Sequence, residues 1–343
     1  MTSSIETLAQ AAARSEVEQA KHGGAQRPMG RVPDFFIVGH FKCGTTALYE
    51  MLKGHPQVFM PETKELWFFS PELRSRGRRP SSLRPETLEQ YLALFAPAAP
   101  EQRAGEASPS YLMSHTAAER IVDVRPDARI IAVLREPASF LRSFHLQCVR
   151  NHVETETDLR KALSLEDARR EGREIPRFCA RPHELLYSDH VRYVEQLERY
   201  RAVFAEEQIL VLIYEDFRRE NEATVRRVQR FLDVDDAVPL GVLEANRSVR
   251  VRSQRLHELT QSVSLGRGPL SRGAKAAIKS VTPRGLRRRA LTATRERVVY
   301  ADTRPPDAAL MLELKRRFKP QAQAVSEYLG RDLVGLWGYD QLD

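Results

Sequence analysis

Cysteine is scarce in this sequence, because the 343 residues hold only Cys43, Cys148 and Cys179. The count is odd and no CxxC pair occurs, so neither a disulfide framework nor a structural zinc site is expected. No apolar run reaches the roughly 18 residues that a membrane-spanning helix requires. Residues 1–29 also lack the basic start, apolar stretch and cleavage site of a signal peptide, which predicts a cytoplasmic protein.

The remaining composition is that of a globular protein, with 42% hydrophobic and 29% charged residues. Lysine and arginine number 54 against 46 aspartates and glutamates, a net charge of +8. A basic surface favours anionic ligands such as phosphates and sulfates. The chain carries no nucleic-acid recognition motif, so no nucleic-acid partner is expected. Its richness in arginine and alanine is typical of a bacterial source with a GC-rich genome.

Short apolar runs alternate with segments of helical spacing along the chain. Residues 34–39, 128–134 and 208–213 are predicted to be buried strands. Helices are predicted at 45–52, 86–95, 115–124, 137–150, 158–172, 189–204 and 221–232. This alternation predicts an α/β fold, a P-loop-like three-layer sandwich whose central parallel sheet is flanked by helices on both faces.

Two segments fall outside this alternation. Residues 1–30 are predicted to be a tail or a frayed helix, and 31–343 to be one domain. Within that domain, about 262–300 is predicted to be a basic helical or flexible insertion, since 267–297 holds many basic residues and a single acid, Glu296. A solvated face is the favoured interpretation of 267–297, and contact with a membrane surface or an anionic acceptor is the alternative.

The first predicted strand ends in Gly39-His-Phe-Lys42-Cys-Gly44-Thr45-Thr46. A strand, a glycine-bounded turn and a helix start form a typical anion site, because backbone N–H groups and the helix N-terminus face the ligand. The spacing is close to an ATP-binding GxxxxGK[ST] loop, but Thr45 occupies the position of its lysine. The loop lysine stands earlier, at Lys42, which suits a donor whose charge lies at the bond between a 5′-phosphate and a sulfuryl group.

Lys42-Cys43-Gly44-Thr45-Thr46, together with Arg135-x-Pro137 and a serine eight residues after Arg135, resembles the two donor-binding elements of sulfotransferases. These enzymes use 3′-phosphoadenosine 5′-phosphosulfate (PAPS). The resemblance covers roughly 34–260 and 310–340 and implies the sulfotransferase fold, with PAPS as co-substrate and no metal. It implies that residues 42–46 bind the 5′-phosphosulfate, and that Arg135 and Ser143 bind the 3′-phosphate.

Four further segments resemble the heparan-sulfate branch of this family. Residues 62–69, with Glu65, are similar to the segment that carries its catalytic glutamate, and 105–111 to its acceptor-side loop. Residues 246–255, with Arg250 and Arg252, resemble a loop that closes over the donor, and 314–337 a closing helix and strand-like end. Ala107 stands where that branch often has a lysine, so an acceptor of heparan-sulfate type is not implied.

The resemblance assigns roles to individual residues. Lys42 is expected to neutralise charge on the departing nucleotide, and Glu65 to be the general base. A surface carboxylate paired with Lys64 or with a nearby arginine is the alternative for Glu65. His115 is a rival base, because the cytosolic small-molecule branch uses histidine, and Glu106 is a further acceptor-side candidate.

The acceptor remains unassigned, as a hydroxyl or amine of a glycan, a lipid or a small molecule. Two other classes stay open: a P-loop nucleotide kinase or NTPase, and a non-catalytic nucleotide-binding protein. The missing loop lysine argues against the first class, and the presence of Lys42 and Glu65 against the second.

Overall fold

The computed structural model describes residues 31–74, 84–177, 179–241, 249–251, 300–302 and 306–342, with backbone alone for 249–251 and 300–302. The predicted tail at 1–30, Arg252 and the basic stretch 267–297 lie outside these residues. Across the described ranges, no helix combines the length and the apolar character needed to cross a membrane.

Five parallel strands form the central sheet, in the order β2-β3-β1-β4-β5. The strands are β1 (Phe35–Gly39), β2 (Val58–Phe59), β3 (Arg103–Ala107), β4 (Arg129–Leu134) and β5 (Ile209–Ile213). Every residue of β1 is buried, which is why this strand is an unbroken apolar run. The prediction of a parallel α/β sheet is confirmed, and β1, β4 and β5 each begin one residue later than expected.

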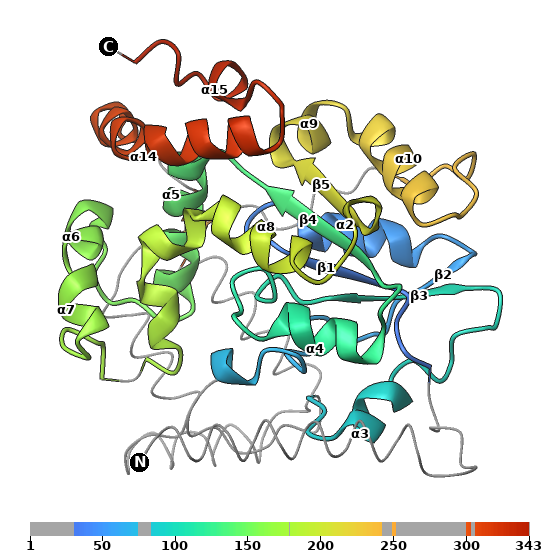
Figure 1. Cartoon of the computed structure of the whole chain (residues 1–343). Helices are drawn as coiled ribbons and strands as arrows, with labels where there is room; N and C mark the ends of the chain where they lie inside the picture. The colour runs from blue at the N-terminus through green and yellow to red at the C-terminus, as the bar shows by residue number, and fades with distance from the viewer. Residues whose placement is uncertain are drawn as a thin grey trace. The chain divides into compact units, whose positions relative to one another are not determined.

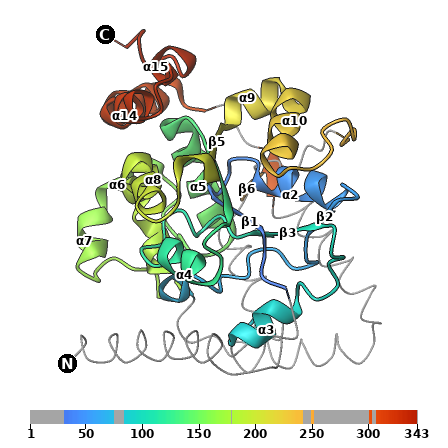
Figure 2. The same ribbon diagram turned by 45° about the vertical axis from the view of Figure 1, so that its right-hand side comes forward.

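Helices cover both faces of this sheet. Figures 1 and 2 show α4 (Ala117–Val124) and α8 (Tyr193–Arg201) together on one face, and α2 (Thr45–Lys53) and α10 (Asn221–Phe231) on the other. The chain moves to one side of β1 to form β2 and β3, and then crosses to the other side to form β4 and β5. The crossovers from β1 to β2 and from β3 to β4 run in opposite directions across the sheet, and right-handed crossovers of opposite direction place their helices on opposite faces. The sheet therefore has a topological switch point at β1.

The chain divides into two compact units. The first, Met1–Leu141 with Leu186–Asn246 and Glu313–Asp343, contains the sheet and the helices α3 (Leu88–Ala93), α9 (Tyr214–Arg219) and α15 (Leu333–Leu336). The second, Arg142–Leu185 with Arg247–Leu312, contains α6 (Leu159–Ser164), α7 (Glu166–Arg170) and the antiparallel pair β6 (Val249–Val251) and β7 (Tyr300–Asp302). The helices α5 (Pro137–Arg150) and α14 (Ala308–Tyr328) begin in one unit and end in the other.

Three expectations about local structure were wrong. Residues 105–107 belong to β3 rather than to a loop, and Gly105 is required there because a Cβ would lie 2.0 Å from the ring of Phe35. The predicted helix at 158–172 is two helices that meet at Leu165, the C-cap of α6 and the N-cap of α7. The end of the chain forms α15 rather than a strand, because Asp332 caps a new helix by accepting a hydrogen bond from the Gly335 N–H.

Candidate active site

The β1–α2 loop, residues 40–44, has a backbone that few sequences allow. Lys42 has φ 58° and Gly44 has φ 82°, so both lie in the left-handed region. A Cβ at Gly44 would also lie 3.0 Å from the ring of Phe217, which restricts this position to glycine. No described side chain caps the N-terminus of α2. Its first N–H groups have no intrahelical partner, which makes the end of this loop suited to an anion.

Arg135 enters this region from the neighbouring strand. Strands β1 and β4 are adjacent and parallel, so their carboxyl ends meet at one edge of the sheet, at the switch point. Arg135 follows β4 directly and donates from Nη1 to the carbonyl oxygen of Lys42, 2.9 Å away. Its guanidinium stacks 4.5 Å above the ring of Tyr214, and its own carbonyl accepts from the Tyr193 hydroxyl at 2.9 Å.

The guanidinium of Arg135 keeps hydrogen-bonding capacity. Its Nε is buried and has no hydrogen-bond partner among the residues that the structure describes. The adjacent carboxylate of Glu136 is occupied elsewhere, since it accepts from the N–H groups of Ala138 at 2.8 Å and Ser139 at 2.7 Å at the start of α5. A buried cationic N–H without an acceptor is costly, and the oxygen of a bound anion would satisfy it.

Residues 62–69 are fixed to the end of β3 from the other side. The N–H of Glu65 donates to the carbonyl of Ala107 at 3.0 Å, and the N–H of Trp67 donates to the Ser108 hydroxyl at 3.3 Å. Both Glu65 and Trp67 adopt left-handed backbone angles, φ 63° and 59°. Non-glycine residues in this region are strained and are often found at functional sites. Glu65 as a whole is half-buried.

Lys64 is the residue that sequence reasoning missed. Its Nζ donates to the hydroxyls of Thr46 at 2.9 Å and Thr45 at 3.3 Å, in the first turn of α2. Burial lowers the pKa of Lys64 to about 8, against the opposing charges of Glu65 and Glu50. The sequence alternative paired Lys64 with Glu65, but the ammonium group donates to the hydroxyls at the start of α2. In the sequence, the only signal that pointed to Lys64 was its position next to Glu65.

Glu106 lies deeper than the sequence predicted. It belongs to β3, is 1% exposed, and accepts hydrogen bonds from the hydroxyls of Tyr91 and Ser108. Burial raises its pKa to about 7 from the usual 4.5, although these hydrogen bonds oppose the shift. In this structure the Glu106 carboxylate is part of the protein interior.

The other predicted residues have varied positions. His115 is exposed in the loop before α4. The thiol of Cys43 is fully buried and donates to the carbonyl of Phe41 at 3.2 Å, so only the backbone of Cys43 is left for a ligand. Ser143 is a buried residue of α5 in the second unit, and Arg250 contributes to β6. Arg252 lies outside the described residues.

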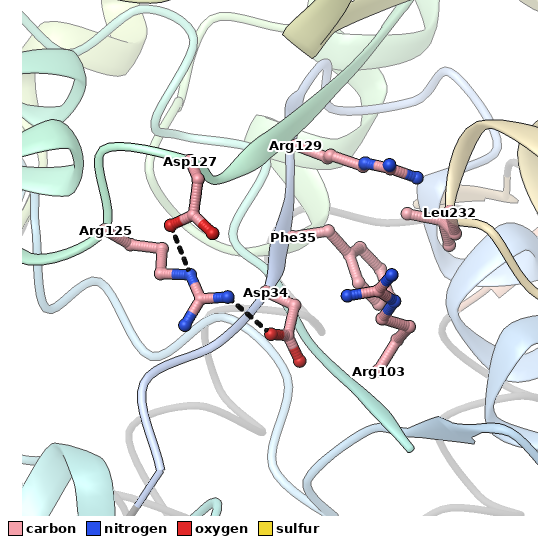
Figure 3. Close-up of a pocket in the computed structure, with 7 residues that line it drawn as sticks. All are labelled: Asp34, Phe35, Arg103, Arg125, Asp127, Arg129 and Leu232. Carbon is pink, nitrogen blue, oxygen red and sulfur yellow. Dashed lines mark hydrogen bonds and ion pairs between the residues drawn. The ribbon is translucent and has the colours of Figure 1, made fainter. Parts of the chain in front are cut away.

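A polar pocket of about 180 Å³ lies at the opposite edge of the sheet, where β1, β3 and β4 begin. Figure 3 shows Arg125 between Asp34 and Asp127, with which it forms ion pairs of 2.9 Å and 2.8 Å. The other two arginines of the pocket, Arg103 and Arg129, both pair with Asp233. Each arginine here has a carboxylate partner, which indicates an ion-pair network that joins the strand starts.

Comparison with known proteins gives a consistent result. A family model described as "Sulfotransferase family" matches residues 33–237, a range that contains the β1–α2 loop, Lys64, Glu65 and Arg135. The solved structure of a sulfotransferase from Alicyclobacillus acidocaldarius is similar with a TM-score of 0.63 and 25% identity, over 91% of this chain and 99% of that chain.

Curated relatives are similar over shorter stretches. Membrane-associated sulfotransferase kil1 of Dictyostelium discoideum is 26% identical over 171 residues, 49% of this chain and 34% of that protein. Human carbohydrate sulfotransferase 15 is 27% identical over 247 residues, 59% of this chain and 44% of that protein. Human bifunctional heparan sulfate N-deacetylase/N-sulfotransferase 3 is 27% identical over 221 residues, 61% of this chain and 23% of that protein. The matches thus span less than half the length of these relatives.

Proposed function

The chain belongs to the sulfotransferase family, and we propose that it transfers a sulfuryl group from PAPS to a hydroxyl or an amine of an acceptor. The observation that carries this proposal is that Arg135 contacts the β1–α2 loop and Lys64 contacts the first turn of α2, so that two cations approach the uncapped N-terminus of α2 from different sides. Two cations and a helix N-terminus at one place favour a ligand with more than one negative charge.

The donor's 5′ end is assigned to the loop. The 5′-phosphosulfate accepts hydrogen bonds from the backbone N–H groups of Cys43 and Gly44 and from the hydroxyls of Thr45 and Thr46. Lys42 lies within this loop and neutralises the charge that develops on the departing nucleotide. By analogy with the removal of one oxyanion donor, Lys42→Ala should lower the rate by roughly 10²–10³.

The donor's 3′-phosphate is assigned to Arg135. One of its N–H groups holds the loop, and the buried Nε retains the capacity to donate to a phosphate oxygen. A planar guanidinium is well matched to phosphate. Ser143, Arg250 and Arg252 remain predicted donor-binding residues from the sequence resemblance.

Glu65 is assigned the role of general base, in preference to the exposed His115. Its segment is tied to the end of β3, and the preceding residue, Lys64, contacts the two threonines in the first turn of α2. The acceptor oxygen or nitrogen attacks sulfur, and its proton passes to the Glu65 carboxylate. The bond between sulfur and the bridging oxygen breaks, and its electron pair leaves with 3′-phosphoadenosine 5′-phosphate (PAP).

Calorimetric titration of the purified chain with PAP, with 5′-AMP and with Mg·ATP tests the proposal. We expect PAP to bind most tightly, because only PAP combines a 5′-phosphate with the 3′-phosphate assigned to Arg135. A preference for Mg·ATP would favour a nucleotide kinase or NTPase. The absence of binding to any of the three nucleotides would contradict the sulfotransferase proposal.

A further inference from the structure

The ammonium group of Lys64 contacts the hydroxyls in the first turn of α2. This turn is where the proposed donor would bind its 5′-phosphosulfate. From this contact we infer that Lys64 is a second transfer-site cation, which binds the sulfuryl group of PAPS. The inference rests on the proposed function and adds a residue that the sequence resemblance did not assign.

The geometry places Nζ beside any anion held by the first turn of α2. Nζ lies 2.9 Å from Thr46 Oγ1 and 3.3 Å from Thr45 Oγ1. An anion oxygen that accepts a hydrogen bond from one of these hydroxyls would lie within roughly 3 Å of it, and so within about 6 Å of Nζ. An ammonium group carries three donors. The two threonine hydroxyls are its only hydrogen-bond partners among the described residues, which leaves a third donor for a ligand oxygen.

Strand order separates the two ends of the donor. Arg135 follows β4, whereas residues 62–69 are tied to the end of β3, and β1 with its loop lies between them. A donor whose 3′-phosphate contacts Arg135 and whose 5′ end lies on the loop therefore directs its sulfuryl group toward the β3 side. Lys64 and the proposed base Glu65 are adjacent residues on that side.

The partial burial of Lys64 should strengthen a hydrogen bond from its ammonium group to a sulfuryl oxygen. Burial lowers the pKa of Lys64 to about 8, although the charges of Glu65 and Glu50 oppose this shift, and the hydrogen-bond partners that replace water are neutral hydroxyls. A sulfuryl oxygen would return a charge-assisted hydrogen bond to this group. In this inference Lys64 acts in its protonated form and forms no covalent bond.

The test compares two ligands that differ only in the sulfuryl group. PAP affinity is measured by calorimetry and ³⁵S-labelled PAPS affinity by equilibrium dialysis, on the wild-type chain and on Lys64→Met and Lys64→Arg variants. We expect Lys64→Met to weaken PAPS binding roughly tenfold or more and PAP binding less than about twofold. Lys64→Arg should recover part of the loss. Lys53→Met is the matched control, because Lys53 lies at the far end of α2 and pairs with Glu62.

The remaining outcomes are distinct. Equal loss of PAP and PAPS affinity would mean that Lys64 only positions the loop, and no loss of either would mean that it does not contact the donor; both overturn the inference. If the wild-type chain binds neither ligand, the proposed function itself fails. Circular dichroism verifies folding, and Lys64→Gln, which retains a hydrogen-bond donor, replaces the methionine variant if that variant does not fold.

Discussion

Arg135 and Lys42 are joined by a hydrogen bond of 2.9 Å, from the guanidinium Nη1 to the backbone carbonyl of the loop lysine. The bond crosses from the end of β4 to the end of β1 and braces a loop in which Lys42 has φ 58°. Arg135 therefore has two separable roles in our proposal: it holds the loop in place, and it binds the 3′-phosphate of the donor.

These two roles predict that Arg135→Ala changes the affinities for PAP and for 5′-AMP differently. Loss of charge-assisted hydrogen bonds to the 3′-phosphate should weaken PAP binding by roughly 100-fold. 5′-AMP lacks the 3′-phosphate, so its affinity should fall far less. Arg135→Lys should lie between wild type and alanine, because lysine keeps the charge but cannot donate from two fixed N–H groups. Calorimetry measures the PAP and 5′-AMP affinities of the wild type and of both variants.

Arg226→Ala is the control for this series, since Arg226 is an exposed residue of α10 that pairs with Glu222. It should leave both affinities unchanged. An equal loss of PAP and AMP affinity in Arg135→Ala would show that Arg135 acts through the loop alone.

Glu65→Gln separates catalysis from donor binding. The substitution keeps the size of the side chain and removes the proton acceptor, so kcat for conversion of PAPS to PAP with a reactive acceptor should fall by roughly 10²–10⁴. PAP affinity should stay within about twofold, because Glu65 is assigned to the acceptor side. Glu62→Gln is the matched control: Glu62 lies three residues earlier, is exposed, and pairs with Lys53 at 2.7 Å. A parallel loss of PAP affinity in Glu65→Gln would point to a structural role.

The sequence was sufficient for the parts of the fold that are continuous apolar runs. Strands β1, β4 and β5 are predicted to within one residue, because buried parallel strands are apolar on both faces. Helix α2 is also predicted to within one residue, from its helical spacing. Strand β3 reads Arg-Ala-Gly-Glu-Ala and carries no such run. Its place in the sheet depends on the fit of Gly105 against Phe35, a tertiary contact that no local pattern reports.

The same limit applies to the site. Strand order brings residues 42–46 and Arg135 to one edge, and that could be anticipated from the two motifs taken together. The direction of Lys64 could not, because it depends on the backbone of residues 62–69 and on the left-handed angle of Glu65. Glu106 was placed in a loop, and its burial follows from the strand that was missed.

Glu106 should make the stability of the fold depend on pH. Its pKa is about 7 in the folded protein against 4.5 ordinarily, owing to burial. Between these values the folded state holds a proton that the unfolded chain has released, so the free energy of unfolding should fall as pH rises across this interval. The total is up to about 3 kcal/mol. Urea unfolding from pH 4.5 to pH 8 measures it.

Glu106→Gln is the matching variant, because glutamine has the same shape and no charge to bury. It should flatten this dependence and equal or exceed the wild type in stability at pH 8. An unchanged pH dependence in the variant would assign the effect to another group.

The ion-pair network at the amino ends of the strands should contribute to stability and not to donor binding. Asp34 is 6% exposed and accepts hydrogen bonds from Arg31 at 2.7 Å, Arg125 at 2.9 Å and the N–H of Ala104 at 2.8 Å. Its removal leaves two partly buried arginines without this carboxylate and frees the start of β3. Asp34→Ala should therefore lower the free energy of unfolding by about 3 kcal/mol, and Asp34→Asn by somewhat less.

Urea unfolding measures this loss, and Asp127→Ala is its control. Asp127 also pairs with Arg125, but its side chain is 75% exposed, so its removal should cost no more than about 0.5 kcal/mol. PAP affinity of the folded Asp34→Asn protein should equal that of the wild type, because parallel strands place this network at the edge opposite the β1–α2 loop. A large loss of PAP affinity with an intact fold would contradict this separation and would place a nucleotide contact at the amino ends of the strands.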